Sequence, residues 1–134
     1  MSNIKKVDDF LTDAEVFYLA TVTEENKPKN RPLGFHMLVD DKIYFGVGTF
    51  KEVYKQMKQN PYVEVSATVM PRFIRYYGKV VFDDNPALID KVFEIMPEIK
   101  ELYEKSGWKM GVFHLEEATC EFRNMIEIEE KYEF

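Results

Sequence analysis

Residues 31–61 read RPLGFHMLVDDKIYFGVGTFKEVYKQMKQNP, and they contain the transitions that decide the fold. Apolar residues on both sides of Asp40-Asp41 predict a hairpin of two strands, 29–39 and 42–48. A helix over 50–59 follows directly and ends before proline. The stretch therefore predicts a strand hairpin that leads into a short helix.

The start of that helix has the features of an anion site. Thr49 and Glu52 have capping-box spacing, so we expect Thr49 to be the N-cap. Lys51 in the first turn opposes the helix dipole, a cost that a bound phosphate would reverse. The free N–H groups at this helix start lie beside Lys51 and within reach of Arg31 across the hairpin, and together they would bind an anion. Phosphate is the commonest anion at such sites.

The rest of the chain predicts a mainly β fold, a small barrel of about six antiparallel strands with three or four helices. Residues 110–128 form one long strand or two shorter ones. Pro86 opens a helix, Pro97 interrupts it, and Gly107 ends the second piece. The other expected elements are strands 16–23, 62–69 and 72–83 and an amphipathic helix over 3–12.

Composition limits the classes of function. The 134 residues predict one domain over 1–134, and 46% hydrophobic residues are enough for a core. A net charge of −6 argues against nucleic-acid binding and against docking on an anionic membrane. The single Cys120 and the lack of an apolar leader favour a cytoplasmic location. No metal-ligand spacing is present, and the acidic run 127–133 is expected to be a solvated end.

Several short motifs, in this order, resemble the FMN-binding split-barrel family of pyridoxamine 5'-phosphate oxidase. They are the strand 16–22, the pair Arg31-Pro32, the run Gly48-Thr49-Phe50-Lys51, the run Asn60-Pro61-Tyr62-Val63 and the strand 74–79. The Arg-Pro-x-Gly-Phe stretch at residues 31–35 resembles a subgroup of small flavin proteins. The Arg-x-Glu-Phe-Trp ending of the vitamin B6 oxidases is absent from residues 129–134.

The resemblance implies a split β-barrel in Greek-key order, a homodimer with FMN at the interface, and a set of cofactor-binding residues. Arg31 would contact the FMN phosphate or the ring edge, and Pro32 and Leu33 would line the isoalloxazine through backbone groups. The implied cofactor-binding residues are Arg31, Pro32, Leu33, Gly34, Val47, Gly48, Thr49, Lys51, Gln56, Trp108 and Asn124.

Some of these residues have alternative interpretations. Gln56 is expected to be a solvated helix residue unless it faces the flavin. Trp108 fits core packing or a dimer contact as well as a cover over the ring. Asn124 lies where relatives bring the last strand toward the flavin. Arg75 is either an exposed strand residue or a cation on the substrate side.

The remaining reactive side chains favour structural roles. His36 is expected to be a satisfied structural histidine, and His114 to lie on the strand surface. Cys120 is expected to be an inert buried thiol.

These expectations predict an FMN-dependent oxidoreductase that acts on a small molecule by hydride transfer at flavin N5, with a nicotinamide nucleotide as one candidate donor. Two alternatives stay open. One is a flavin-binding sensor, carrier or stress protein without turnover, and the other is a relative that uses a deazaflavin or haem.

Overall fold

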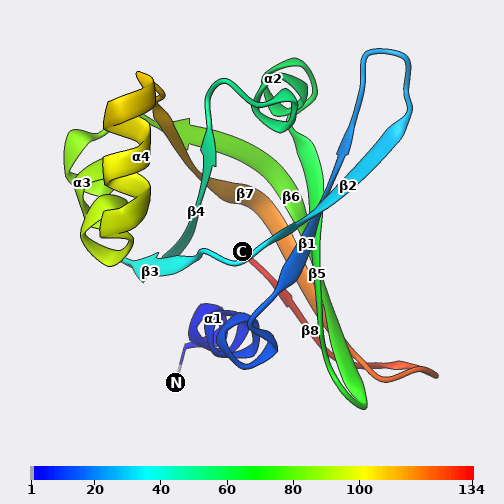
Figure 1. Cartoon of the computed structure of the whole chain (residues 1–134). Coiled ribbons are helices and arrows are strands. Elements are labelled where there is room, and N and C mark those ends of the chain that lie inside the picture. The colour runs from blue at the N-terminus through cyan, green and yellow to red at the C-terminus, as the bar shows by residue number, and fades with distance from the viewer. Residues whose placement is uncertain (1) are drawn as a thin grey trace.

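Eight antiparallel strands and four helices make up the computed structural model of this chain, which describes residues 2–134 (Figure 1). The strands are β1 (Phe17–Val22), β2 (Pro28–Leu33), β3 (Met37–Val39), β4 (Lys42–Gly48), β5 (Tyr62–Val69), β6 (Arg72–Asp83), β7 (Met110–Arg123) and β8 (Ile128–Glu133). The helices are α1 (Asn3–Ala14), α2 (Glu52–Gln59), α3 (Pro86–Ile95) and α4 (Pro97–Ser106). The predicted mainly β, antiparallel architecture is confirmed, with eight strands in place of about six.

Two segments differ from the prediction. The strand expected over 29–39 divides into β2, which pairs with β1, and β3, which pairs with β4. The acidic run 127–133 is mostly exposed, as expected for a solvated end, but its residues 128–133 also form the strand β8, which was not predicted. Strand β8 pairs with the second half of β7, which extends beyond the end of β4 and leaves its backbone groups open to a partner.

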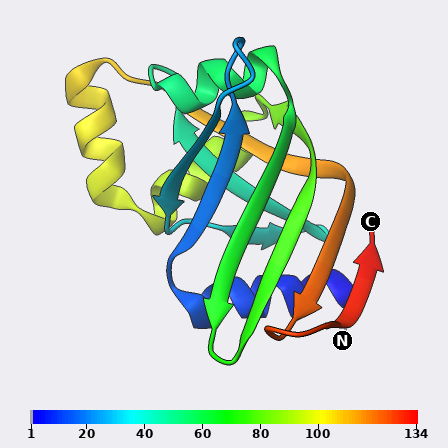
Figure 2. The same ribbon diagram turned by 90° about the vertical axis from the view of Figure 1, so that its right-hand side faces the viewer.

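The strands follow the order β2-β1-β5-β6-β7-β4-β3, with β8 beside β7. The long strand β7 has β6 along one edge, and β4 and then β8 along the other. A β-bulge interrupts the β6–β7 register between Tyr77 and Lys79, and bulges bend the strands that carry them. Figure 2 shows that the face formed by β1, β5, β6 and β7 is not covered by a helix.

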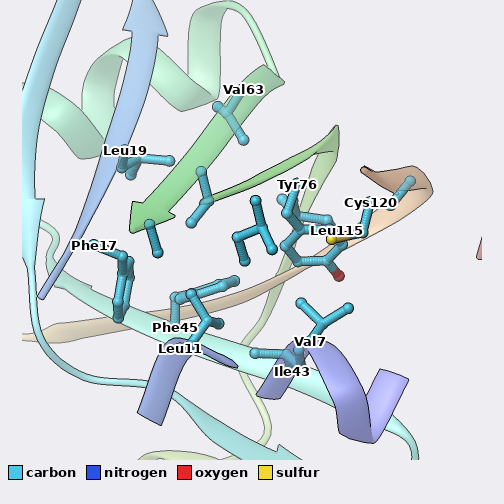
Figure 3. Packing of buried hydrophobic residues seen from close by; sticks show 14 of the residues in the cluster. Val7, Leu11, Phe17, Leu19, Ile43, Phe45, Val63, Tyr76, Leu115 and Cys120 are labelled. Carbon is cyan, nitrogen blue, oxygen red and sulfur yellow. The ribbon is translucent and has the colours of Figure 1, made fainter. Parts of the chain in front are cut away.

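The barrel interior holds one hydrophobic core, closed by α1 and α2 (Figure 3). Val7 and Leu11 of α1 are fully buried against it, and Val53 and Met57 of α2 cover the other end. The spacing of these residues explains the closure, because side chains three or four positions apart lie on one face of a helix. The apolar stripes therefore fix where both short helices sit.

A second core lies between the outer face of β4 and β7 and the helices α3 and α4. It includes Tyr44, Val112, Leu88, Val92 and Tyr103. Because β4 is covered on both faces, its sequence is almost continuously apolar. The predicted break at Pro97 and the helix end at Gly107, which has φ 71°, are both confirmed.

None of the helices described over residues 2–134 has the length and apolar character needed to cross a membrane.

Candidate functional site

The edges of β2 and of the second half of β4 that face helix α2 have no strand partner among residues 2–134. Strand β2 pairs only with β1, and residues 45–48 of β4 pair only with β7. Helix α2 packs against both β1 and β4 and thus bridges the two ends of the sheet (Figure 1). Most of the predicted cofactor residues lie on these elements or directly beside them in the chain: Arg31, Pro32, Leu33, Gly34, Val47, Gly48, Thr49, Lys51 and Gln56.

The residues of the two edges differ in what they can offer a ligand. Pro32 and Gly34 are exposed and Leu33 is half-buried, so this segment is open to contact. Val47 points into the core and is only 4% exposed, which leaves its backbone as the part that could reach a ligand. Gly48 is buried because the Phe50 ring and the Tyr103 hydroxyl lie where a Cβ would be, at 2.4 and 2.9 Å.

Arg31 is half-buried and held by neutral acceptors. Its Nη1 donates to the Leu19 carbonyl at 3.1 Å and to Thr21 Oγ1 at 2.7 Å, and its Nη2 donates to Gln56 Oε1 at 3.0 Å. Burial lowers the pKa of the Arg31 guanidinium, but an arginine side chain stays charged in proteins. The guanidinium therefore keeps a positive charge that none of these partners neutralises.

The three other arginines of the chain show what Arg31 lacks. Arg72, Arg75 and Arg123 all form ion pairs with glutamates. Arg75 uses its Nε and Nη2 as a fork on the Glu64 carboxylate. Arg31 has no carboxylate partner among residues 2–134, and its Nε–H has no hydrogen-bond acceptor there. This free side of the guanidinium suits an oxyanion, which Arg binds through the same fork.

Thr21 was not predicted as a site residue, although it connects the network. Its hydroxyl accepts from Arg31 and donates to Gln56 Oε1 at 2.5 Å, and the residue is 1% exposed. The signal in the sequence is a polar residue in phase with the inward-facing Phe17 and Leu19 of the same strand. The expectation that Gln56 is solvated is wrong, because its side chain holds both Thr21 and Arg31.

The predicted capping box does not form. Helix α2 starts at Glu52, and Lys51 occupies the N-cap position without a side-chain cap. The amide of Lys51 donates to the Gly48 carbonyl at 3.1 Å, so a turn separates β4 from the helix. The cause is non-local: Phe50 stacks on Trp108 with centroids 4.2 Å apart, and Thr49 N–H donates to the Lys109 carbonyl at 2.9 Å.

Lys51 remains available to a ligand. The residue is exposed, and its ammonium forms no ion pair within residues 2–134. Its ammonium lies 5.9 Å from the centroid of the Phe50 ring. The nearby Lys55, by contrast, pairs with Glu52 at 3.3 Å. At the start of α2 the amides of Glu52 and Val53 have no backbone acceptor within residues 2–134, so cation and amides together favour an anion.

Thr49 and Trp108 lie in a different part of the structure from Arg31. Both line a cavity of about 380 Å³ between α2, the end of β6, α3 and the start of β7. Its walls include Tyr54, Phe82 and Gly111. Trp108 is 39% exposed, stacked on Phe50 and edge-on to Tyr103, which supports its interpretation as a packing residue.

Asn124 is not brought near the other predicted residues in this chain. It lies in the turn between β7 and β8, at the opposite end of β7 from Gly111. Its side-chain oxygen accepts from the amides of Ile126 and Glu127, and its Nδ2 donates to Glu129. These contacts give Asn124 a structural role in the turn.

The two histidines have different surroundings. His36 joins β3 to α1 through Asp8, with 2.7 Å between Nδ1 and Oδ1, so the structural interpretation is confirmed. The expectation that His114 lies on the surface is wrong, since the residue is 4% exposed. Tyr44 on the paired strand β4 covers its ring edge-on, and Nε2 lies 2.8 Å from Glu116.

Cys120 and Arg75 also have structural roles. Cys120 is fully buried, and burial raises the pKa of its thiol to about 12, which confirms an inert thiol. Arg75 is an exposed strand residue paired with Glu64.

Comparison with known proteins agrees with this geometry. The family model for pyridoxamine 5'-phosphate oxidase matches residues 4–115, which is most of the chain. No curated protein matches the sequence. A NimC/NimA family protein from Clostridium acetobutylicum is 29% identical with a TM-score of 0.86, and the match covers 100% of this chain and 95% of that one.

Two more distant structures share the fold. A pyridoxamine 5'-phosphate oxidase-related, FMN-binding protein from Nostoc punctiforme is 16% identical, with a TM-score of 0.69 over 99% of this chain and 89% of that one. A haem-binding protein from Mycobacterium smegmatis is 12% identical, with a TM-score of 0.72 over 99% of this chain and 58% of that one. The chain belongs to the pyridoxamine 5'-phosphate oxidase family and has its split-barrel fold.

Proposed function

We propose that this protein binds FMN at the split between β2 and β4 and acts as an oxidoreductase on a small molecule. The observation that carries the proposal is Arg31, a half-buried cation whose partners are all neutral and whose Nε–H is free of protein acceptors. A phosphate monoester supplies the negative charge and the acceptor oxygens that this side chain lacks. The FMN-binding relative from Nostoc punctiforme adds support at the level of the fold.

The residues divide into two groups by what they would hold. Arg31 and Lys51 would bind the phosphate, with the first amides of α2 beside them. The exposed segment 32–34 would support the ring through backbone groups, which β2 leaves unpaired on this edge. When bound, FMN supplies hydride transfer at its N5 atom. The chain itself contributes anchoring, orientation and control of access.

Haem is the less favoured cofactor, although one structural relative binds it. Haem iron needs an axial side-chain ligand, most often histidine. His36 and His114 are both engaged with carboxylates, and His114 is buried.

The first experiment is the absorption spectrum of the protein purified without added cofactor, followed by release of any chromophore. We expect flavin bands and FMN at about one per chain. A colourless protein that fails to take up FMN, or a haem spectrum, would overturn the proposal.

The phosphate site is tested by removing its cations. We expect Lys51→Ala together with Arg31→Ala to weaken FMN binding by several kcal/mol, since each charged contact contributes about 1.5–3 kcal/mol. Lys55→Ala is the control for the Lys51 substitution, because it removes one positive charge one turn further along, outside the proposed site. Equal affinity in the double variant and the control would refute the assignment.

Turnover distinguishes the enzyme from a flavin-binding module. Bleaching of the bound flavin by NADPH, with reoxidation by a small-molecule acceptor, is the result expected for an oxidoreductase. A flavin that stays oxidised with every donor and changes its spectrum when a protein partner binds would favour a sensor or carrier.

A further inference from the structure

The cavity beside α2 has the size and lining of a small-molecule site. Its volume of about 380 Å³ lies within the range of roughly 300–1,000 Å³ typical of ligand pockets. The aromatic rings of Tyr54, Phe82, Phe93 and Trp108 line it. Gly111 lets the Tyr54 ring lie close to the β7 backbone, because a Cβ there would sit 3.1 Å from that ring.

The cavity and the Arg31 side chain lie against different flanks of helix α2. At 100° per residue, Tyr54 and Gln56 point about 160° apart around the helix, on either side of the buried Val53 and Met57. Gln56 contacts Arg31, whereas Tyr54 contacts Phe82 with ring centroids 4.8 Å apart. A ligand in the cavity therefore faces a different flank of α2 from a ligand at Arg31.

The aromatic wall attracts positive charge. The ammonium of Lys58 lies 5.3 Å from the centroid of Phe82 and 5.7 Å from that of Tyr54. A cation within about 6 Å of a ring face is stabilised by the ring's quadrupole. The same two rings also line the cavity.

The charged residues around the cavity favour a cation too. Asp83 and Asp84 line it, and neither forms an ion pair within the part of the chain that the structure describes. Lys109 is the only lining cation among these residues, which leaves the lining with an excess of negative charge. We propose that this cavity binds a small aromatic amine in its cationic form, with its ring among the aromatic side chains and its ammonium at Asp83 and Asp84.

The proposal is tested by calorimetric titration of the full chain with 2-phenylethylamine and with 3-phenylpropionate, which pairs a similar ring with the opposite charge. We expect the amine to bind at least roughly tenfold more tightly than the carboxylate. Trp108 is the only tryptophan, so its fluorescence should change on binding. Equal affinities, or binding without a change at Trp108, would overturn the proposal without depending on any variant.

Substitutions of the two aspartates test where the ammonium group of the ligand binds. Asp83→Asn with Asp84→Asn should lower amine affinity at least roughly tenfold. Asp90→Asn is the control, since it removes a neighbouring exposed carboxylate that does not line the cavity. A similar loss of amine affinity in the Asp83/Asp84 double variant and in the Asp90 variant would show that the effect comes from the net charge of the protein. That result would refute the site.

Competition with FMN checks that the site is separate. We expect stoichiometric FMN to leave amine affinity unchanged. Displacement of the amine by FMN would make the cavity part of the cofactor site and overturn the inference, while the FMN proposal would stand.

Discussion

At the scale of single residues, the hydroxyl of Thr21 joins three elements. It lies on β1, accepts from Arg31 on β2 and donates to Gln56 on α2. A buried polar group without a partner is costly, so each of these side chains depends on the other two. The network orients the guanidinium of Arg31 and keeps its Nε–H pointing away from protein acceptors.

Removing that hydroxyl tests the network. We expect Thr21→Val, which keeps the shape of the side chain, to lower the free energy of unfolding by about 1–3 kcal/mol, because Gln56 and Arg31 lose a buried partner. Thr68→Val is the control, since Thr68 is an exposed residue of β5. Urea unfolding measures both variants. Equal stability of Thr21→Val and wild type would show that the network contributes nothing to the fold.

At the scale of elements, the sequence patterns correctly predicted the strands and helices that local interactions determine. Strands 62–69 and 72–83 are confirmed with the predicted bounds, because alternation and the intervening Pro71 are visible in the sequence itself. Helices α3 and α4 are confirmed for the same reason, with prolines in their first turns.

The wrong predictions concern residues whose structure depends on contacts with segments far away in the sequence. The start of α2 depends on the stacking of Phe50 against Trp108, which is far away in the sequence. Likewise His114 is buried because β4 pairs with β7 and brings Tyr44 over it. The site was predicted in part for the same reason. A motif indicated Arg31, whereas the contact between Arg31 and Thr21 depends on the pairing of β1 with β2.

The bulge between β6 and β7 gives a prediction for an element. At Gly78 an added Cβ would lie 2.9 Å from Ala118 Cα and from the Glu116 carbonyl, so the two backbones leave no room for it. We expect Gly78→Ala to lower the free energy of unfolding by about 1–3 kcal/mol. Gly34→Ala is the control, because the nearest atom to a Cβ there is 3.9 Å away. Equal urea midpoints for the two variants would contradict the role of Gly78 in the bend.

At the scale of the whole molecule, the sheet face of β1, β5, β6 and β7 is the surface that no helix covers (Figure 2). Tyr18 on β1 and Tyr62 on β5 are 45% and 62% exposed, and both point outward from the barrel core. Tyrosine is a frequent anchor of protein interfaces. This face is where we expect two copies of the chain to pair.

Sedimentation equilibrium tests the pairing. We expect a mass of about twice the 15.9 kDa chain, and a shift toward the monomer for Tyr18→Asp with Tyr62→Asp, because the charges would be buried without partners. Leu102→Asp, a change at an exposed apolar residue of α4, should leave the dimer intact. A monomeric wild type would exclude the dimer.

FMN affinity in the monomeric variant then decides how the cofactor is held. A large loss of affinity would show that the partner completes the site, whereas unchanged affinity would show that Arg31, Lys51 and their neighbours in one chain are sufficient.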